Sequence, residues 1–334
     1  ALFISTANAQ FIYNFTANSG TYTQIPAGTA VAILGDDIHG AAIIPFNFNF
    51  VFDGVTYTQC KVSSNGWIAL ETTDAPSAVD GRFNNLDGAL GQGQTTPAST
   101  RPCIAPLWDD LDGASGTAGP AAVYETTGAV GSRVWTMEWR NWQWNFAAPI
   151  NTAQISFQCK LYEGTNAIEF IYRQEAGAIN NTTGGASIGL ARGAVGSGNF
   201  LSLSNASAAP TASYSAETDN IATKPATGQA YRFEPIVCTP PSSTFAVVND
   251  CGNNQFFVDL TLTSLGDAAS VDLVSNLLGL EEDDVTALIT YQLGPYPSGS
   301  SVTITVVHNT VVGCNQVHSI GTITCPVVIS SLPY

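Results

Sequence analysis

The chain has 334 residues, of which 45% are hydrophobic and 10% aromatic, a composition that excludes a disordered polypeptide and suffices for two domains with separate cores. Only 11% of the residues are charged, and the formal net charge of −16 argues against nucleic-acid and anionic-membrane partners, because a negative field repels phosphate groups. No apolar run in the sequence has the length that a membrane-spanning helix requires.

Residues 1–10 combine an apolar patch with the small-residue pattern Ala7-Asn8-Ala9. This pattern is typical of the end of a secretory signal, of which residues 1–10 would be a remnant. The alternative is a retained apolar strand at residues 1–4 that pairs with a sheet edge of another copy. The sequence leaves both interpretations open.

Residues 11–235 show the alternation and the turns of a large β module. The segment 43–52 places Phe46, Phe48, Phe50 and Phe52 on one face. Asp53-Gly54 and Asn65-Gly66 are strong turn signals before the strands predicted at 55–62 and 67–70. Further strands are predicted at 121–126, 133–144, 154–162 and 167–172, with long loops at 73–101 and 176–187.

A linker around Pro240-Pro241 precedes a second β module at 236–328, because neither proline can donate to a ladder. Its strands are predicted at 255–262, 271–274, 286–293, 301–308 and 318–324, and residues 329–334 form a C-terminal extension. The composition suits helices badly, because even the best candidate segment, residues 275–288, is interrupted by Gly279.

Seven cysteines without a CxxC pair, together with only three histidines, favour disulfides in an oxidising compartment over a zinc site. Four of them bracket the second module, and the preferred pairing is Cys238–Cys325 with Cys251–Cys314, although the connectivity cannot be proved from sequence. Cys60, Cys103 and Cys159 cannot all pair with one another. Cys60 and Cys159 are the candidate pair, and which of the three is free or bonded between chains stays open.

The best candidate metal site is the acidic loop Asp109, Asp110 and Asp112, which offers carboxylates and a turn of the kind that calcium prefers. Asp36 and Asp37 form another acidic loop that the fold can bring near it. The alternative is that these carboxylates cap N–H groups of turns at strand ends.

An enzymatic reading has little support. Glu138 lies among tryptophans, which can shift its pKa, but no second carboxylate is placed at the separation that glycoside hydrolysis needs. No histidine stands near a nucleophile elbow. Four tryptophans lie between Trp135 and Trp144, and alternation puts Trp135 and Trp139 on one face and Trp142 and Trp144 on the other. They suggest either sugar stacking or, as is commoner for large aromatics, core packing.

Four segments carry a family resemblance: 44–54, 62–68, 104–113 and 134–141. In order and spacing they resemble the nidogen-like module over residues 40–172. The chain is also similar to surface proteins of Bacteroidetes, whose signal peptides end in sequences like Ala7-Asn8-Ala9-Gln10 and whose modules precede a cysteine-bracketed sandwich. The resemblance implies an extracellular adhesion or matrix role and brings no catalytic residues.

We therefore expect an all-β protein: a large antiparallel β-sandwich followed by a small, disulfide-stapled, immunoglobulin-like β-sandwich. We expect a non-catalytic, secreted protein that acts as an adhesin module or as a self-assembling filament subunit. Its expected partners are other copies of itself, other surface proteins or glycans, and calcium is the one candidate cofactor. The alternative is a secreted carbohydrate-binding or carbohydrate-active protein.

Overall fold

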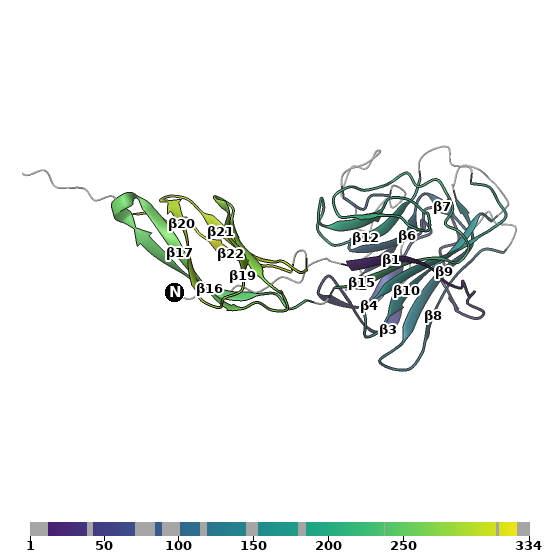
Figure 1. Cartoon of the computed structure of the whole chain (residues 1–334). Helices are drawn as coiled ribbons and strands as arrows, with labels where there is room; N and C mark the ends of the chain where they lie inside the picture. The colour runs from purple at the N-terminus through teal and green to yellow at the C-terminus, as the bar shows by residue number, and fades with distance from the viewer. Residues whose placement is uncertain are drawn as a thin grey trace, which may run out of the picture. The chain divides into compact units, whose positions relative to one another are not determined.

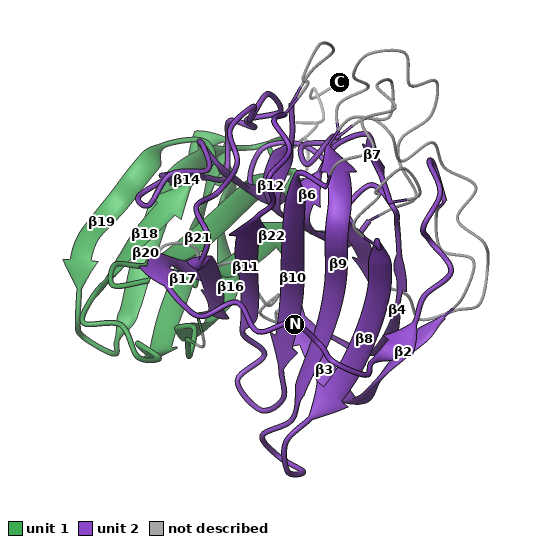
Figure 2. Cartoon of the chain, turned by 90° about the vertical axis from the view of Figure 1, so that its right-hand side faces the viewer, with its two compact units in different colours: residues 1–12, 236–334 green, residues 13–235 purple. Residues whose placement is uncertain are grey.

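The computed structural model describes residues 13–38, 43–70, 84–88, 101–113, 119–144, 153–179, 185–236, 238–311 and 314–325. These residues form antiparallel sheets and one 3₁₀ turn, without an α-helix among them, and the expected all-β fold is confirmed. The chain divides into two compact units between Pro235 and Ile236 (Figures 1 and 2). The predicted strand at residues 1–4 lies outside the described residues.

The first unit along the chain, residues 13–235, is purple in Figure 2, where it carries the label unit 2, and it contains two sheets. The eight-stranded sheet has the order β1 (Tyr13–Ser19), β15 (Gln229–Pro235), β11 (Ile168–Gln174), β10 (Ile155–Tyr162), β9 (Val134–Trp144), β8 (Ala121–Thr127) and β2 (Thr29–Ala30), with β7 (Leu111–Asp112) paired to β9. The seven-stranded sheet has the order β14 (Ala212–Ser213), β13 (Phe200–Leu203), β12 (Ser187–Ala191), β6 (Cys103–Trp108), β5 (Ile68–Leu70), β4 (Val55–Val62) and β3 (Ile44–Phe52).

The inward faces of these sheets form an aromatic core. All four phenylalanines predicted to share a face of β3 are buried. Phe46 packs edge-on against Trp135 of the opposite sheet at a ring-centroid distance of 5.1 Å. The Tyr172 hydroxyl on β11 donates to the Pro106 carbonyl on β6 at 2.6 Å, which satisfies a polar group that would otherwise be costly to bury.

A β-bulge in β9 overturns the expected division of the tryptophans between two faces. Trp142 pairs with Ile155 and Trp139 with Phe157, so β9 carries one residue more than β10 between these pairs. Asn141 adopts a positive φ of 57° there. The extra residue shifts the alternation by one position, so Trp142 points to the same interior as Trp139.

The second unit, from Ile236 onward, contains two sheets around its own core. The three-stranded sheet has the order β16 (Ser242–Asp250), β17 (Gln255–Ser264) and β20 (Thr290–Pro297). The four-stranded sheet has the order β19 (Gly279–Val285), β18 (Val271–Ser275), β21 (Val302–His308) and β22 (Gln316–Ile320). The strand β19 lies within residues 275–288, the segment that came nearest to a helical pattern, and it is extended as the all-β prediction requires.

The disulfides are Cys238–Cys314 and Cys251–Cys325, so the preferred pairing was wrong. Cys238 and Cys314 precede β16 and β22, whereas Cys251 and Cys325 follow them. The two strands therefore run in the same direction, and like ends are joined. The expected pairing assumed opposite directions.

The three remaining cysteines, Cys60, Cys103 and Cys159, are buried free thiols, and the prediction of a Cys60–Cys159 disulfide was wrong. Cys60 lies on β4 and Cys159 on β10, in opposite sheets. Packed sheets lie about 10 Å apart, whereas a disulfide needs Cα atoms within about 7 Å. Burial raises the pKa of both thiols, which keeps them protonated and unreactive.

Candidate functional site

The centre of the candidate site is the buried turn Ser63-Ser64-Asn65-Gly66 between β4 and β5. Gly66 has a φ of +73°, and a Cβ atom there would lie 2.0 Å from the Leu107 carbonyl oxygen. Glycine is required on both counts, because other residues rarely adopt this φ and none could tolerate that contact. The sequence identified this turn from its Asn-Gly pair.

Three tryptophans of β9 donate their indole N–H groups to this region. Trp139 donates to the Ser63 carbonyl at 2.9 Å and Trp142 to the Ser64 carbonyl at 2.8 Å. Trp144 donates to Oδ2 of Asp109 at 2.6 Å. All three side chains are fully buried, so they fix the turn and do not present a stacking surface to a sugar.

Asn65 holds two acidic loops against the turn. Its side-chain amide donates to Oδ1 of Asp37 at 3.1 Å, and its Oδ1 accepts the Leu111 N–H at 3.0 Å. Its carbonyl accepts the Asp109 N–H at 3.3 Å. Nothing in the sequence marked Asn65 for this role, because the contacts join segments far apart along the chain.

The structure brings three of the five predicted metal ligands together. Carboxylate oxygens of Asp36, Asp37 and Asp110 all lie within 4.8 Å of one another, with Asp36 exposed and the other two half-buried. Oxygen ligands from short loops are what calcium prefers. The convergence follows from the hydrogen bonds of Asn65 to both loops.

Asp109 and Asp112 stand apart from this group. Asp109 caps its own turn, because its Oδ1 accepts the Asp110 N–H at 2.8 Å while Oδ2 accepts Trp144. Burial raises the pKa of Asp109, although these two hydrogen bonds oppose the shift. Asp112 is buried in β7, opposite Gln143. The capping interpretation therefore describes Asp109.

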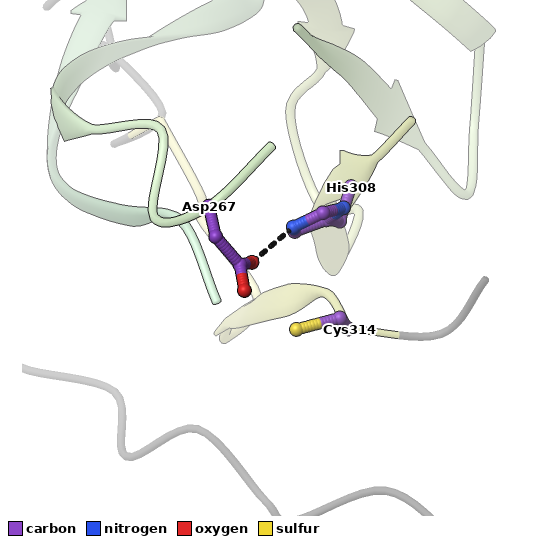
Figure 3. A group of neighbouring side chains, drawn as sticks. All are labelled: Asp267, His308 and Cys314. Atoms are coloured by element: carbon purple, nitrogen blue, oxygen red, sulfur yellow. Dashed lines mark hydrogen bonds and ion pairs between the residues drawn. The ribbon is translucent and has the colours of Figure 1, made fainter. Parts of the chain in front are cut away.

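A second group, Asp267, His308 and Cys314, is structural (Figure 3). Cys314 is committed to its disulfide with Cys238. Nδ1 of His308 accepts two backbone N–H groups, from Thr310 and Val311, so its Nε2 carries the proton that bonds to Asp267 at 2.7 Å. The ring is thereby fixed in one tautomer beside the disulfide.

A third group joins Asp272, Asp283 and Asp284 in the second unit. The Asn309 amide donates to Asp272 at 2.6 Å and to Asp284 at 3.0 Å. These hydrogen bonds offset part of the repulsion between the carboxylates. No local pattern in the sequence marked this group.

Glu138, the carboxylate considered for catalysis, is fully buried. It accepts hydrogen bonds from Tyr22 at 2.7 Å, Gln158 at 3.0 Å and Arg140 at 3.0 Å. Its oxygens therefore serve internal structure.

A family model described as NIDO related matches residues 12–235. The chain belongs to the NIDO-related family. The match coincides with the first compact unit, so the Ser63–Gly66 turn, the three tryptophans and the Asp36–Asp37–Asp110 group all lie within the NIDO-related unit. No curated protein and no solved structure matches the chain. Within the described part of the chain, no helix has the length and apolar character to cross a membrane.

Proposed function

We propose that the chain is a non-catalytic extracellular protein with a structural or adhesive role, as a cell-surface adhesin module or as a subunit of a self-assembling surface filament. The NIDO-related unit is the observation that carries this proposal, because such a unit suggests an extracellular protein. Two disulfides in the second unit support it, since disulfides persist in oxidising compartments.

The second unit supports the same role as an immunoglobulin-like module. Three and four strands face each other, and its first and last strands run in the same direction. Sandwiches of this kind occur in many cell-surface proteins. The likeness is one of architecture and identifies no partner.

The charge of this module disfavours contacts between two copies of it. The sequence from residue 236 to 334 contains eight carboxylate side chains and no Lys or Arg. Two copies of this module repel each other at low ionic strength. If copies assemble, we expect contacts through the first unit, which carries all ten Lys and Arg residues.

Deletion of residues 1–10 separates the two forms of the proposal. Size exclusion and negative-stain microscopy of the full chain should show filaments or oligomers that become folded monomers on deletion if the chain self-assembles. A monomer unaffected by deletion that binds the surface of the producing cells supports the adhesin form. A monomer that binds no cell surface, and whose disulfides are reduced when it is isolated from those cells, would contradict both.

We further propose that Asp36, Asp37 and Asp110 hold a calcium ion that stabilises the two loops. Calcium titration of chelator-treated protein should release or absorb heat and raise the melting temperature. The double variant Asp37→Asn/Asp110→Asn should abolish both effects, and the exposed control Asp219→Asn should retain them. Equal responses in the two variants would contradict the site.

The tryptophans that the carbohydrate alternative would use to stack against sugars are not exposed. Trp142 and Trp144 are fully buried and donate to Ser64 and Asp109. Binding of the folded protein to a glycan array would be needed to support this alternative again.

A further inference from the structure

The strands β1 and β2 follow each other in sequence but occupy opposite edges of the eight-stranded sheet. The connecting residues 20–28, here called the strap, must cross the whole sheet. Six strand spacings amount to about 29 Å, and the ten Cα steps from Ser19 to Thr29 reach at most about 33–36 Å. The strap is therefore close to fully extended.

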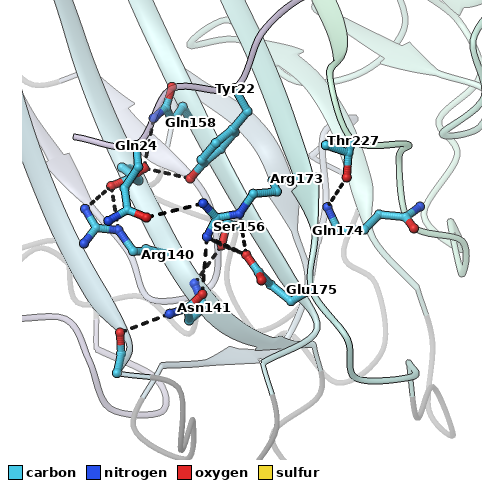
Figure 4. A network of polar contacts seen from close by, with 12 residues as sticks. Tyr22, Gln24, Arg140, Asn141, Ser156, Gln158, Arg173, Gln174, Glu175 and Thr227 are labelled. Atoms are coloured by element: carbon cyan, nitrogen blue, oxygen red, sulfur yellow. Dashed lines mark hydrogen bonds and ion pairs between the residues drawn. The ribbon is translucent and has the colours of Figure 1, made fainter. Parts of the chain in front are cut away.

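Contacts along the strap follow this crossing strand by strand. The Gly20 N–H donates to the Gly228 carbonyl beside β15 at 2.7 Å. The Arg173 guanidinium on β11 lies over the Tyr22 ring, 4.8 Å from its centroid. Gln158 on β10 donates to the Thr23 carbonyl at 2.7 Å. Figure 4 shows Tyr22 and Gln24 lying among these polar side chains.

At β9 the strap contacts the ion pair of Glu138 and Arg140. The Glu138 carboxylate accepts the Tyr22 hydroxyl and, at 3.4 Å, the Ile25 N–H. Arg140 pairs with Glu138 and also donates to the Ile25 carbonyl at 2.6 Å. Glu138 is fully buried. Removing the donors of a buried carboxylate is strongly destabilising, because its charge is left uncompensated. We call this group the pin.

The chain enters and leaves the first unit at one point. Tyr13, the first residue of β1, pairs with Pro235, the last residue of β15, and the ladder continues to Ser19 opposite Gln229. Tension between the segment before Tyr13 and the second unit therefore acts on one end of this ladder. It opens the hydrogen-bonded pairs one after another instead of shearing them together.

We propose that β1 and the strap form a tension-released clasp, which peels from the sheet as far as the pin and then, at higher force, as far as β2. Release frees the edge of β15, and a free edge can accept another strand. The clasp is a property of the fold and holds whether or not the chain is adhesive. Its use requires a role in which the chain carries force, and so rests on the proposed function.

Single-molecule force spectroscopy on the full chain, pulled from its two ends, tests the clasp. Before the first unit unfolds, peeling should free about 30 Å of chain contour as residues 13–21 leave the sheet and about 23–25 Å more as residues 22–28 follow, at 3.3–3.6 Å per residue. Unfolding of the first unit in one step, without early events of this size, would overturn the proposal.

Two sets of variants assign the steps. The double variant Asn14→Cys/Glu234→Cys joins register partners that are both exposed, and when oxidised it should remove both early steps, whereas each single variant should keep them. Glu138→Gln should raise the rate of the second step at fixed force about tenfold or more. Glu169→Gln, on the same sheet but paired with Lys160 and Arg232, should leave it unchanged.

Tyr22→Phe removes a single hydroxyl from the pin and keeps the test valid if Glu138→Gln fails to fold. It should accelerate the second step in the same direction. Early steps that persist in the oxidised double-cysteine variant, or a second step indifferent to both pin variants, would show that the clasp does not open as proposed.

Discussion

The two units of this protein reach stability by different means. The first buries all of its tryptophans and leaves its three cysteines as free thiols. The second is far smaller and carries both disulfides. A small domain buries a smaller fraction of its surface and so gains more from cross-links. The same chain thus uses disulfides only in the unit whose core is small.

Charge separates the two units as well. Cations of the first unit are held close to carboxylates, as in Arg133–Glu163, Arg173–Glu175 and Arg192–Asp53. The second unit has no Lys or Arg to match its acids. Its carboxylates are instead stabilised by neutral donors, of which the Asn309 amide is one. The stability of the first unit is therefore expected to depend on pH through its ion pairs. The stability of the second unit is expected to depend more on salt concentration.

The largest effect should come from the disulfides. With Cys238–Cys314 intact, Cys251–Cys325 closes a loop that runs through residues 238–251 and 314–325. Cys251→Ser/Cys325→Ser opens this loop of roughly 26 residues, for which the chain-entropy relation gives a loss of roughly 3–4 kcal/mol. Differential scanning calorimetry should show the transition of the second unit moving to lower temperature while that of the first stays in place. An equal shift of both transitions would break the comparison.

Next in size is the glycine of the buried turn. Gly66→Ala should cost the first unit roughly 3 kcal/mol or more, because strain at positive φ adds to a collision with the Leu107 carbonyl. Gly131 also has a positive φ, of 92°, but its Cβ would meet no atom within 4 Å. Gly131→Ala should therefore cost only about 1 kcal/mol. Denaturant melts of the two variants measure the difference, and similar losses would show that the close contact is unimportant.

The indole hydrogen bonds should have a smaller effect. Trp142→Phe leaves the buried Ser64 carbonyl without its indole donor, whereas the buried Nε1 of Trp135 has no hydrogen-bond partner among the described residues. Trp142→Phe should therefore be less stable than Trp135→Phe by about 1–2 kcal/mol. Equal unfolding free energies would mean that these tryptophans act through volume alone.

The smallest effect concerns pH. The Arg133 guanidinium lowers the pKa of Glu163 from 4.5 to about 2. Because the folded pKa lies below the unfolded value, the stability from this pair is complete above pH 4.5 and is lost as the pH falls through about 2. Glu163→Gln should flatten the dependence of the first unit's melting temperature on pH in that window. An unchanged slope would show that the Arg133–Glu163 pair does not contribute to the pH dependence of the first unit's stability.

Local patterns in the sequence predicted part of this architecture. The alternation of four phenylalanines predicted β3 to within one residue, and the Asn65-Gly66 pair predicted the turn on which the candidate site is built. The tryptophan faces were wrong because the bulge at Asn141 adds one residue that no local signal marks. Alternation alone cannot show where its phase changes.

Errors of a second kind came from long-range geometry. The disulfide pairing depended on the relative direction of β16 and β22, two strands separated by the whole second unit. The grouping of Asp36 and Asp37 with Asp110 was only suggested, and it depends on contacts of Asn65 that join three distant segments. Asp109 looked equivalent to Asp110 in sequence but caps its own turn.

The two disulfides also shorten the covalent path through the second unit. Along bonds alone, the shortest route from Cys238 to Cys325 crosses to Cys314 and then follows the chain for eleven residues. The eleven residues can stretch to about 36–40 Å and the disulfide adds 6.3 Å between its Cα atoms, whereas the main chain between the two positions is several times longer. Pulling on both ends of the unit therefore tightens a short covalent loop and leaves β17 to β21 outside the path of the force.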